Sequence, residues 1–307
     1  MRTRIRRLLL LAALPIAILM ALPFSALAQQ RFSGERALEI TRQFVAIGPR
    51  WVGSPGHAKA EAFLRNQFKH DQLEEDVFTA NTPIGAVPMR NFIVRFPGKK
   101  NGVIVLTTHY ETNYPLRNTG FVGANDGGST TGLLIEIANS LRGHTLDGYS
   151  IWLVFFDGEE AINQWQGTDH TYGSRHLAAK WGGDGTLKRI KALLLADMLG
   201  DKDLDVERET QSTPWLADLV ARAAKNTGHS KNFFAKSEQV EDDHMAFLQR
   251  GVPAVDIIDL DYGPHTAQLP DGYHHTPQDT MDKLSARSLT IAGDVFLETI
   301  KLVNQTR

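Results

Sequence analysis

The chain contains no cysteine, and its 307 residues carry a formal net charge of only −2, with a pI of about 6.6. Disulfides and a lipid-modified cysteine are therefore excluded, so the fold has to be stabilised by a hydrophobic core. The small net charge gives no support for a nucleic-acid partner or for an anionic membrane surface. After residue 30 the sequence also lacks repeats, low-complexity tracts and linker-like composition, which favours one large domain over two small ones.

A long apolar run occurs at the N-terminus. Four arginines among the first seven residues precede it, and the small-residue sequence Ala26-Leu27-Ala28 follows it. This order predicts a secretory signal peptide over residues 1–28 and a mature chain over residues 29–307. The alternative is a transmembrane anchor, which Pro15 and Pro23 disfavour. We therefore expect an exported protein, periplasmic or secreted, with no stable membrane anchor.

Patterns typical of strands and helices alternate along the mature chain. Apolar runs predict strands at 91–96, 103–107, 151–156, 192–195 and 254–258, and helical spacing predicts helices at 34–46, 57–69, 130–142, 173–181, 214–226 and 284–304. The runs VIVL and IWLVFF are continuous enough for central strands buried on both faces. The sequence therefore predicts an α/β fold, a single-domain three-layer sandwich with a mostly parallel central sheet.

Acids and histidines gather where the predicted strands end. In open α/β sheets, ligands bind just beyond the carboxyl ends of the strands, so side chains at these positions are expected to meet. The glutamate pair that follows IWLVFF is the clearest case. The residues concerned are His109, Asp126, Glu159, Glu160, Asp197 and His275.

These residue types indicate a metal site. Each has an ordinary alternative, because an aspartate can cap a helix and an acid pair can begin one. However, so many neighbouring carboxylates would raise one another's pKa values unless a cation were present. Zinc accepts three or four nitrogen and oxygen ligands of this kind. We expect a zinc site at the carboxyl ends of the strands, with one glutamate of the pair binding metal and the other acting as a general base.

Longer motifs at the same positions resemble the zinc aminopeptidase superfamily over nearly the whole mature chain. The segments RWVGSPGHAKAEAFL, TTHYET, VGANDGGSTTGLLIEIANSL, FFDGEEA, LLLADMLG and HHTPQDTMDKL occur in family order. Two further segments, DGEEAINQWQGTDHTYGSRHLAAKW and EDDHMAFLQRGVP, resemble the animal-type glutaminyl-peptide cyclotransferases within that superfamily.

The resemblance to the cyclotransferases implies a role for each matching position. Asp126, Glu160 and His275 match the ligands of a single catalytic zinc, and Glu159 matches the residue that transfers the proton. Asp197 and Asp242 match acids that form a hydrogen-bonded network with this glutamate. Trp165 matches an aromatic wall of the substrate pocket.

The two-zinc aminopeptidases of the same superfamily use these positions differently. There the positions of His109 and Asp197 hold a second metal, and that of Asp126 bridges both ions. All these side chains are present, so ligand identity does not separate the two branches.

Two positions depart from the family patterns. Family members usually read His-x-Asp at the first histidine, whereas this chain reads His109-Tyr110-Glu111. The glutamate side chain is one methylene longer than the aspartate, and this argues against a tight second metal site. The cyclotransferases usually carry tryptophan before the last histidine, where this chain has His274. Tyr273 or Trp165 is then expected to supply the aromatic wall, with His274 beside the substrate.

We therefore expect a zinc-dependent enzyme that converts the N-terminal glutamine of peptides or proteins to pyroglutamate and releases ammonia. It would use one zinc ion, or two if the second site is filled. One alternative is an exported di-zinc aminopeptidase, in which Glu159 would act as the base for a metal-bound water. Another is a non-catalytic exported binding domain, which the intact set of acids and histidines disfavours. The sequence indicates no particular oligomeric state.

Overall fold

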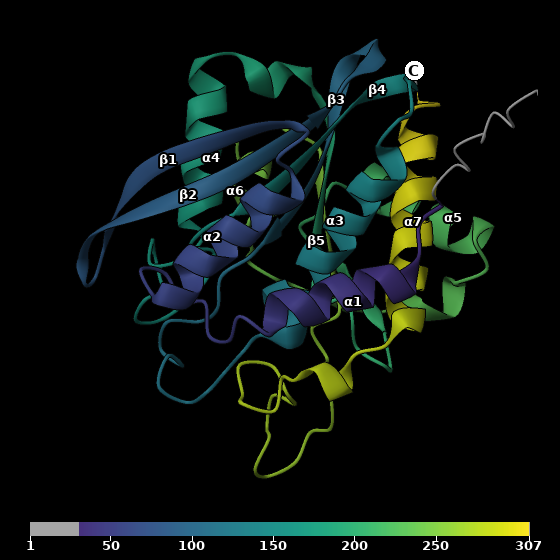
Figure 1. Ribbon diagram of the computed structural model, residues 1–307. Helices are drawn as coiled ribbons and strands as arrows, with labels where there is room; N and C mark the ends of the chain where they lie inside the picture. The colour runs from purple at the N-terminus through teal and green to yellow at the C-terminus, as the bar shows by residue number, and fades with distance from the viewer. Residues whose placement is uncertain (1–30, 307) are drawn as a thin grey trace, which may run out of the picture. The chain divides into compact units, whose positions relative to one another are not determined.

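A six-stranded sheet forms the centre of the molecule in the computed structural model, which describes residues 31–306 (Figure 1). The predicted signal peptide lies outside these residues. In spatial order the strands are β1 (Gln72–Thr82), β2 (Gly85–Phe96), β4 (Leu146–Phe156), β3 (Gly98–His109), β5 (Ile190–Asp197) and β8 (Ala254–Ile258). Strands β4, β3, β5 and β8 run parallel, while β2 pairs antiparallel with β4, and β1 pairs antiparallel with β2 at the edge.

The register of the parallel strands brings their carboxyl ends to one edge. His109 at the end of β3 pairs with Phe156 at the end of β4. On the other side, Thr107 of β3 pairs with Leu195 of β5. The side chains that follow these strands therefore start from neighbouring positions.

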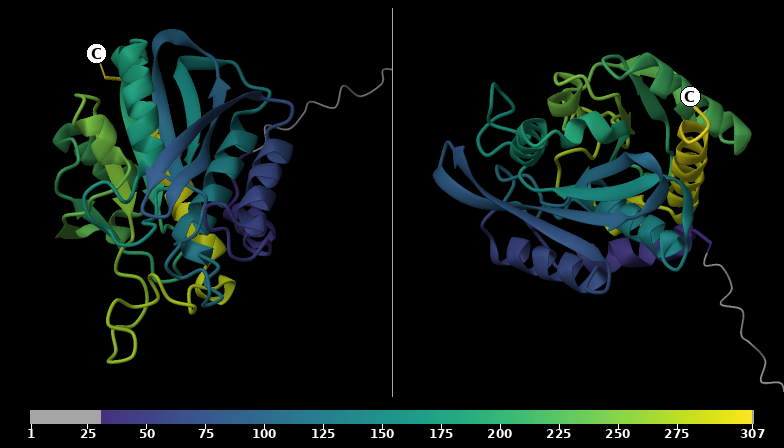
Figure 2. Two further views of the ribbon diagram at one scale, coloured as in Figure 1. Left: turned by 90° about the vertical axis from the view of Figure 1, so that its left-hand side faces the viewer. Right: turned by 90° about the horizontal axis from the view of Figure 1, so that it is seen from above.

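Helices cover both faces of the sheet, as the view from above shows (Figure 2). One face is covered by α1 (Gly34–Val45), α2 (Pro55–Gln67), α3 (Thr130–Leu141), α5 (Pro214–Asn226) and α7 (Ala286–Val303). The other face is covered by α4 (Tyr172–Gly183) and α6 (His244–Leu248). The three-layer α/β sandwich predicted from the sequence is confirmed.

Alternating side chains of the central strands build the two core layers. In β3, Ile104 and Leu106 pack against the layer of five helices, whereas Val103 and Val105 pack against the layer of α4 and α6. All four are fully buried because successive residues of a strand point to opposite faces. This arrangement accounts for the continuous apolar run in the sequence.

Three strands were not predicted. Strand β1 has only two buried residues among eleven and lies at the edge of the sheet, so it lacks a clear apolar pattern. The short strands β6 (Val206–Glu209) and β7 (Phe233–Glu238) pair in parallel as a separate small sheet. Among residues 31–306, no helix combines the length and apolar character needed to span a membrane.

Candidate active site

The carboxyl ends of three strands bring the predicted site residues together. His109 is the last residue of β3, and Asp197 is the last residue of β5. Glu159 and Glu160 follow β4 after a two-residue turn. All four side chains are buried, so the end of the sheet carries acids and a histidine out of contact with bulk water.

A glycine-rich loop, Ala124–Ser129, holds Asp126 against His109. Gly127 adopts the left-handed region at φ 70°, and a Cβ atom there would lie 2.9 Å from Cε1 of His109, so only glycine fits. The carboxylate of Asp279 accepts the backbone N–H groups of Asn125 at 2.8 Å and of Asp126 at 3.2 Å. These bonds fix the direction in which Asp126 points.

Asp126 lies between two histidines, His109 and His275. Its Oδ1 is 3.0 Å from Nε2 of His109, and its Oδ2 is 3.4 Å from Nε2 of His275. Nε2 of His275 is also 3.1 Å from Oε1 of Glu160, and Nε2 of His109 is 3.5 Å from Oδ1 of Asp197. All five predicted metal-ligand positions are therefore brought into one cluster.

Several buried atoms of this cluster have no hydrogen-bond partner among residues 31–306. They are both ring nitrogens of His109, Oδ2 of Asp126 and Oδ1 of Asp197. Buried polar groups are almost always paired, so unpaired ones at a single place call for a ligand. The ligand atoms of His109, Asp126 and Asp197 lie within 4.8 Å of one another, as do those of Asp126, His274 and His275. This mixed nitrogen and oxygen donor set fits zinc.

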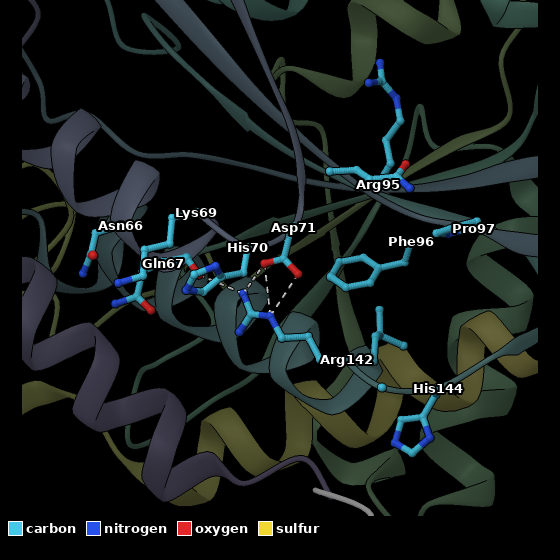
Figure 3. Close-up of a pocket in the computed structure, with 13 residues that line it drawn as sticks. Asn66, Gln67, Lys69, His70, Asp71, Arg95, Phe96, Pro97, Arg142 and His144 are labelled. Atoms are coloured by element: carbon cyan, nitrogen blue, oxygen red, sulfur yellow. Dashed lines mark hydrogen bonds and ion pairs between the residues drawn. The ribbon is translucent and has the colours of Figure 1, made fainter.

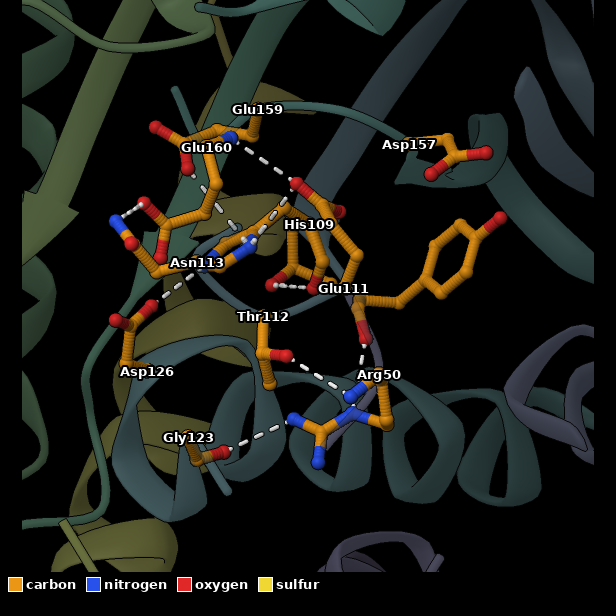
Figure 4. A network of polar contacts seen from close by, with 12 residues as sticks. Arg50, His109, Glu111, Thr112, Asn113, Gly123, Asp126, Asp157, Glu159 and Glu160 are labelled. Carbon is orange, nitrogen blue, oxygen red and sulfur yellow. Dashed lines mark hydrogen bonds and ion pairs between the residues drawn. The ribbon is translucent and has the colours of Figure 1, made fainter. Parts of the chain in front are cut away.

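Glu111 and Asn113 position Glu160 from behind. Oε1 of Glu111 accepts the backbone N–H of Glu160 at 3.0 Å, and Nδ2 of Asn113 donates to Oε2 of Glu160 at 2.8 Å (Figure 4). The same Glu111 oxygen is 3.9 Å from Nδ1 of His109. Burial raises the pKa of Glu111 to about 7. The longer side chain, which the sequence presented as a departure from the family pattern, thus contacts the main chain of a predicted ligand.

The sequence did not identify Arg50 as a residue that supports the site. Its buried guanidinium donates to the carbonyl oxygens of Tyr110 at 3.2 Å, Val122 at 2.7 Å and Gly123 at 3.0 Å. These bonds tie the end of β3 to the loop that carries Asp126 (Figure 4). Arginine is rarely buried, so composition alone gives no signal for such a role.

A cavity of about 330 Å³ opens onto the cluster. Among the predicted residues, its walls include Glu159, Trp165, Asp242 and His274, together with the ligand positions Asp126, Glu160, Asp197 and His275. The ring of Trp165 stacks on His170 at a centroid distance of 4.3 Å. We call this space the catalytic cavity.

Tyr273 lies elsewhere than the sequence suggested. Its ring packs edge-on against Tyr262, with centroids 5.4 Å apart, and it lines a neighbouring hollow beside Lys283. Trp165 is therefore the aromatic residue that faces the cluster. His275, two positions further on, has a left-handed backbone at φ 50°, which is uncommon for a non-glycine residue and is often found at functional sites.

Asp242 also lines the catalytic cavity and lies just before α6. Burial and the neighbouring Asp197 raise the pKa of Asp242 to about 6. Burial also raises the pKa of Glu159 well above its ordinary value, and Asp242 and Glu160 act in the same direction. Carboxyl groups in such a cluster share protons, so this end of the sheet can hold a proton and release it.

Comparison with known proteins identifies the family. The family model described as Peptidase family M28 matches residues 91–300. The glutaminyl-peptide cyclotransferase-like protein of Bos taurus is 30% identical over 261 residues, which cover 74% of this chain and 68% of the relative.

Solved structures give the same result. The crystal structure of the Acidobacteriales bacterium glutaminyl cyclase is 65% identical, with a TM-score of 0.88, and the match covers 90% of this chain and 96% of that one. The glutaminyl cyclase of Porphyromonas gingivalis is 27% identical, with a TM-score of 0.78 and coverage of 88% and 98%. This chain belongs to peptidase family M28 and, within it, to the branch of the glutaminyl-peptide cyclotransferases.

Proposed function

We propose that this protein is a zinc-dependent glutaminyl-peptide cyclotransferase. It converts the N-terminal glutamine of peptides and proteins to pyroglutamate and releases ammonia. The observation that carries the proposal is the 65% identity to a bacterial glutaminyl cyclase over nearly the whole folded chain. The buried cluster of acids and histidines at the catalytic cavity supports it independently.

Asp126, Glu160 and His275 would hold the catalytic zinc. Their side chains contact one another, with Nε2 of His275 at 3.4 Å from Asp126 and 3.1 Å from Glu160. Bound zinc supplies Lewis-acid polarisation of the side-chain carbonyl of the substrate glutamine. Glu111 and Asn113 keep Glu160 in place through the two hydrogen bonds described above.

Glu159 moves the proton in this proposal. The α-amine nitrogen of the substrate attacks the side-chain amide carbon, and the bond from this carbon to the amide nitrogen breaks. Glu159 accepts the proton that the amine loses and gives it to the departing nitrogen, which leaves as ammonia. Asp242 and Asp197 lie beside Glu159 and keep the proton within the cluster.

The tethering of nucleophile and electrophile in the substrate favours cyclisation over attack by water. Nucleophile and electrophile belong to the same residue, so the cavity needs only to hold the glutamine in a bent conformation. Trp165 provides a flat apolar wall for that side chain and limits the space for water.

A second candidate, an aminopeptidase with two metal ions, rests on one observation. The ligand atoms of His109, Asp126 and Asp197 form a group of their own within 4.8 Å. A second cation there would suit the superfamily's hydrolytic members. The longer Glu111 behind His109 and the 65% identity to a cyclase make this the weaker candidate.

The experiment that separates the candidates uses the mature protein with zinc and two short peptides, one beginning with glutamine and one with leucine. Mass spectrometry follows both. Loss of ammonia from the glutamine peptide alone supports the cyclotransferase. Release of free leucine supports the aminopeptidase, and no reaction with either peptide overturns both proposals.

We also propose that the protein is exported and that its catalytic domain begins at residue 29, after cleavage at Ala28. The mature chain would then begin with Gln29, which is itself a substrate for cyclisation. Mass spectrometry of the exported protein would locate the cleavage site. An N-terminus that retains the arginine-rich segment would contradict this proposal.

A further inference from the structure

A second cavity of about 440 Å³ adjoins the catalytic cavity. The two share Leu260 and His274 as lining residues, and Glu238 of the second cavity directly precedes Gln239 of the first. We call this second space the outer cavity. Its walls come from β6, from β7 and from the long loop that follows β8. The β6 residue, Glu207, is buried, and its carboxylate accepts the backbone N–H groups of Leu260 and Asp261.

Two basic side chains of the outer cavity, Lys236 and His265, are already paired with the same carboxylate. Nζ of Lys236 is 2.5 Å from Oδ2 of Asp261, and Nε2 of His265 is 2.6 Å from Oδ1 of Asp261. Nζ of Lys236 also lies 3.5 Å from Oδ2 of Asp205. These cations are therefore balanced within the protein.

Two exposed carboxylates of the outer cavity are not balanced. Glu238 and Asp271 are exposed and form no ion pair with any residue between 31 and 306. A third exposed acid, Glu241, lies on the wall of the catalytic cavity, and its closest base is His170 at 4.0 Å. The route from one cavity to the other therefore presents a net negative charge.

A peptide substrate has to occupy more than the catalytic cavity. Only its first residue reacts, and each further residue adds up to about 3.5 Å of chain. The second and third residues of the substrate must therefore lie just outside the catalytic cavity. The outer cavity adjoins it at Leu260 and His274, and its volume accommodates a long side chain.

We propose that the outer cavity binds the residues after the N-terminal glutamine and that Glu238 and Asp271 select a basic side chain there, lysine or arginine. This inference rests on the proposed function. It assigns a substrate class, peptides with glutamine first and a basic residue second or third. Peptides with an acidic residue at those positions are repelled by the same two carboxylates.

The expected preference is moderate because both carboxylates are exposed. Exposed ion pairs contribute little each, and attraction of lysine combined with repulsion of glutamate yields about a 5- to 10-fold difference in kcat/KM. Since the Debye length shrinks to about 4 Å near 0.5 M salt, the preference should largely disappear there.

The test compares amidated peptides that differ at one position: Gln-Ala-Ala, Gln-Lys-Ala, Gln-Ala-Lys, Gln-Glu-Ala and Gln-Ala-Glu. Each is measured at low salt and at 0.5 M salt with wild-type enzyme and with the double variant Glu238→Gln/Asp271→Asn. The control is Asp147→Asn, which removes an exposed carboxylate at the start of β4, at the opposite end of the sheet.

We expect wild type and the Asp147→Asn control to prefer a lysine peptide by 5- to 10-fold, and the double variant to lose most of that preference. Equal kcat/KM for all five peptides would overturn the outer cavity as a charge-selective subsite while leaving the cyclotransferase intact. A preference that survives in the double variant would also overturn the assignment. Failure to cyclise Gln-Ala-Ala at all would instead contradict the proposed function.

Discussion

The two ends of the central sheet carry cavities of opposite character. At the amino ends of β3 and β4, a hollow of about 550 Å³ lies between the end of α2, the end of β2 and the end of α3 (Figure 3). Its two arginines are paired. Nη2 of Arg142 is 2.6 Å from Oδ2 of Asp71 and also donates to the carbonyl oxygen of Gln67 at 2.9 Å, and Arg95 is paired with Glu74.

At the carboxyl ends the cavity is smaller, about 330 Å³, yet several buried groups in and beside it have no hydrogen-bond partner among residues 31–306. His109 has no hydrogen-bond partner within the described chain for either ring nitrogen. Keeping such groups buried costs folding free energy unless a ligand satisfies them. The difference teaches that unsatisfied buried groups, and not cavity size, mark the functional end of this sheet.

The largest effect is expected from Glu159→Gln. The amide cannot accept the amine proton, so the rate of glutamine cyclisation should fall about 1,000-fold. Zinc content should not change, because Glu159 is not among the proposed ligands. Ammonia release measures the cyclisation rate, and atomic absorption measures the zinc content. If zinc is lost with activity, Glu159 is a ligand, and the division of roles within the glutamate pair is wrong.

Zinc removal should lower the free energy of unfolding, because the proposed ligands lie at the carboxyl ends of the strands. A metal that binds only the folded state adds about 4 kcal/mol at a free concentration 1,000 times its dissociation constant. We expect thermal unfolding to shift upward with zinc in wild type and not in Asp126→Asn.

The matched control for the zinc experiment is Asp71→Asn at the paired end. This variant should keep the whole zinc-dependent shift, since Asp71 is bound to Arg142 and far along the sheet from the cluster. An equal loss of the shift in both variants would mean that the carboxylate at Asp126 does not bind the metal.

Unpaired acids at the carboxyl end should also make stability depend on pH. Asp259 follows β8, is fully buried and has no hydrogen-bond partner for either side-chain oxygen among residues 31–306. Burial, with Asp201 and Glu207 nearby, raises its pKa to about 9. In the unfolded chain the pKa returns to about 3.9, so the folded state binds the extra proton between these values.

Stability should therefore fall as pH rises through this window, by up to about 1.4 kcal/mol per pH unit from Asp259 alone. Asp259→Asn mimics the neutral form and removes that contribution. In urea unfolding, we expect the free energy of unfolding of the variant to rise relative to that of wild type between pH 5 and pH 8. A difference between the two proteins that is the same at both pH values would mean that Asp259 is ionised in the folded state.

The sequence predicted the fold well where strands are buried on both faces. The run IWLVFF in β4 has apolar residues pointing into both layers, and so has VIVL in β3. Strand β1 escaped prediction because edge strands expose most of their side chains to water. It pairs with β2 through a hairpin turn between Thr82 and Gly85, and this turn has little hydrophobic pattern.

The ends of the predicted strands also located the site. His109 and Asp197 follow directly from parallel strands that meet at one edge, so their proximity needs no detailed geometry. The roles of Arg50 and Asp279 depend on how loops fold over that edge, which spacing does not reveal. Tyr273 is the opposite case. Although it is adjacent to His274 in sequence, its ring lines a different hollow.

Trp165→Ala should reduce kcat/KM for glutamine peptides by about 10-fold, because one flat wall of the catalytic cavity is lost. Most of the change should appear in KM. Trp215 provides the matched control, since it is similarly exposed, at 42% against 39%, but lies on α5 away from the cavity. If Trp215→Ala has the same effect, the loss reflects general packing and not the cavity wall.

The smallest effect tests the paired end of the sheet. Asp71→Asn removes the charge that Arg142 binds through two of its nitrogens, and the pair is partly exposed, so unfolding free energy should fall by only about 1 kcal/mol. Cyclisation of glutamine peptides should stay at the wild-type rate, because Asp71 lies at the amino ends of the strands and does not line the catalytic cavity. A marked loss of activity without loss of folding would show that the two ends of the sheet are coupled. Paired charges would then no longer distinguish a structural end from a functional one.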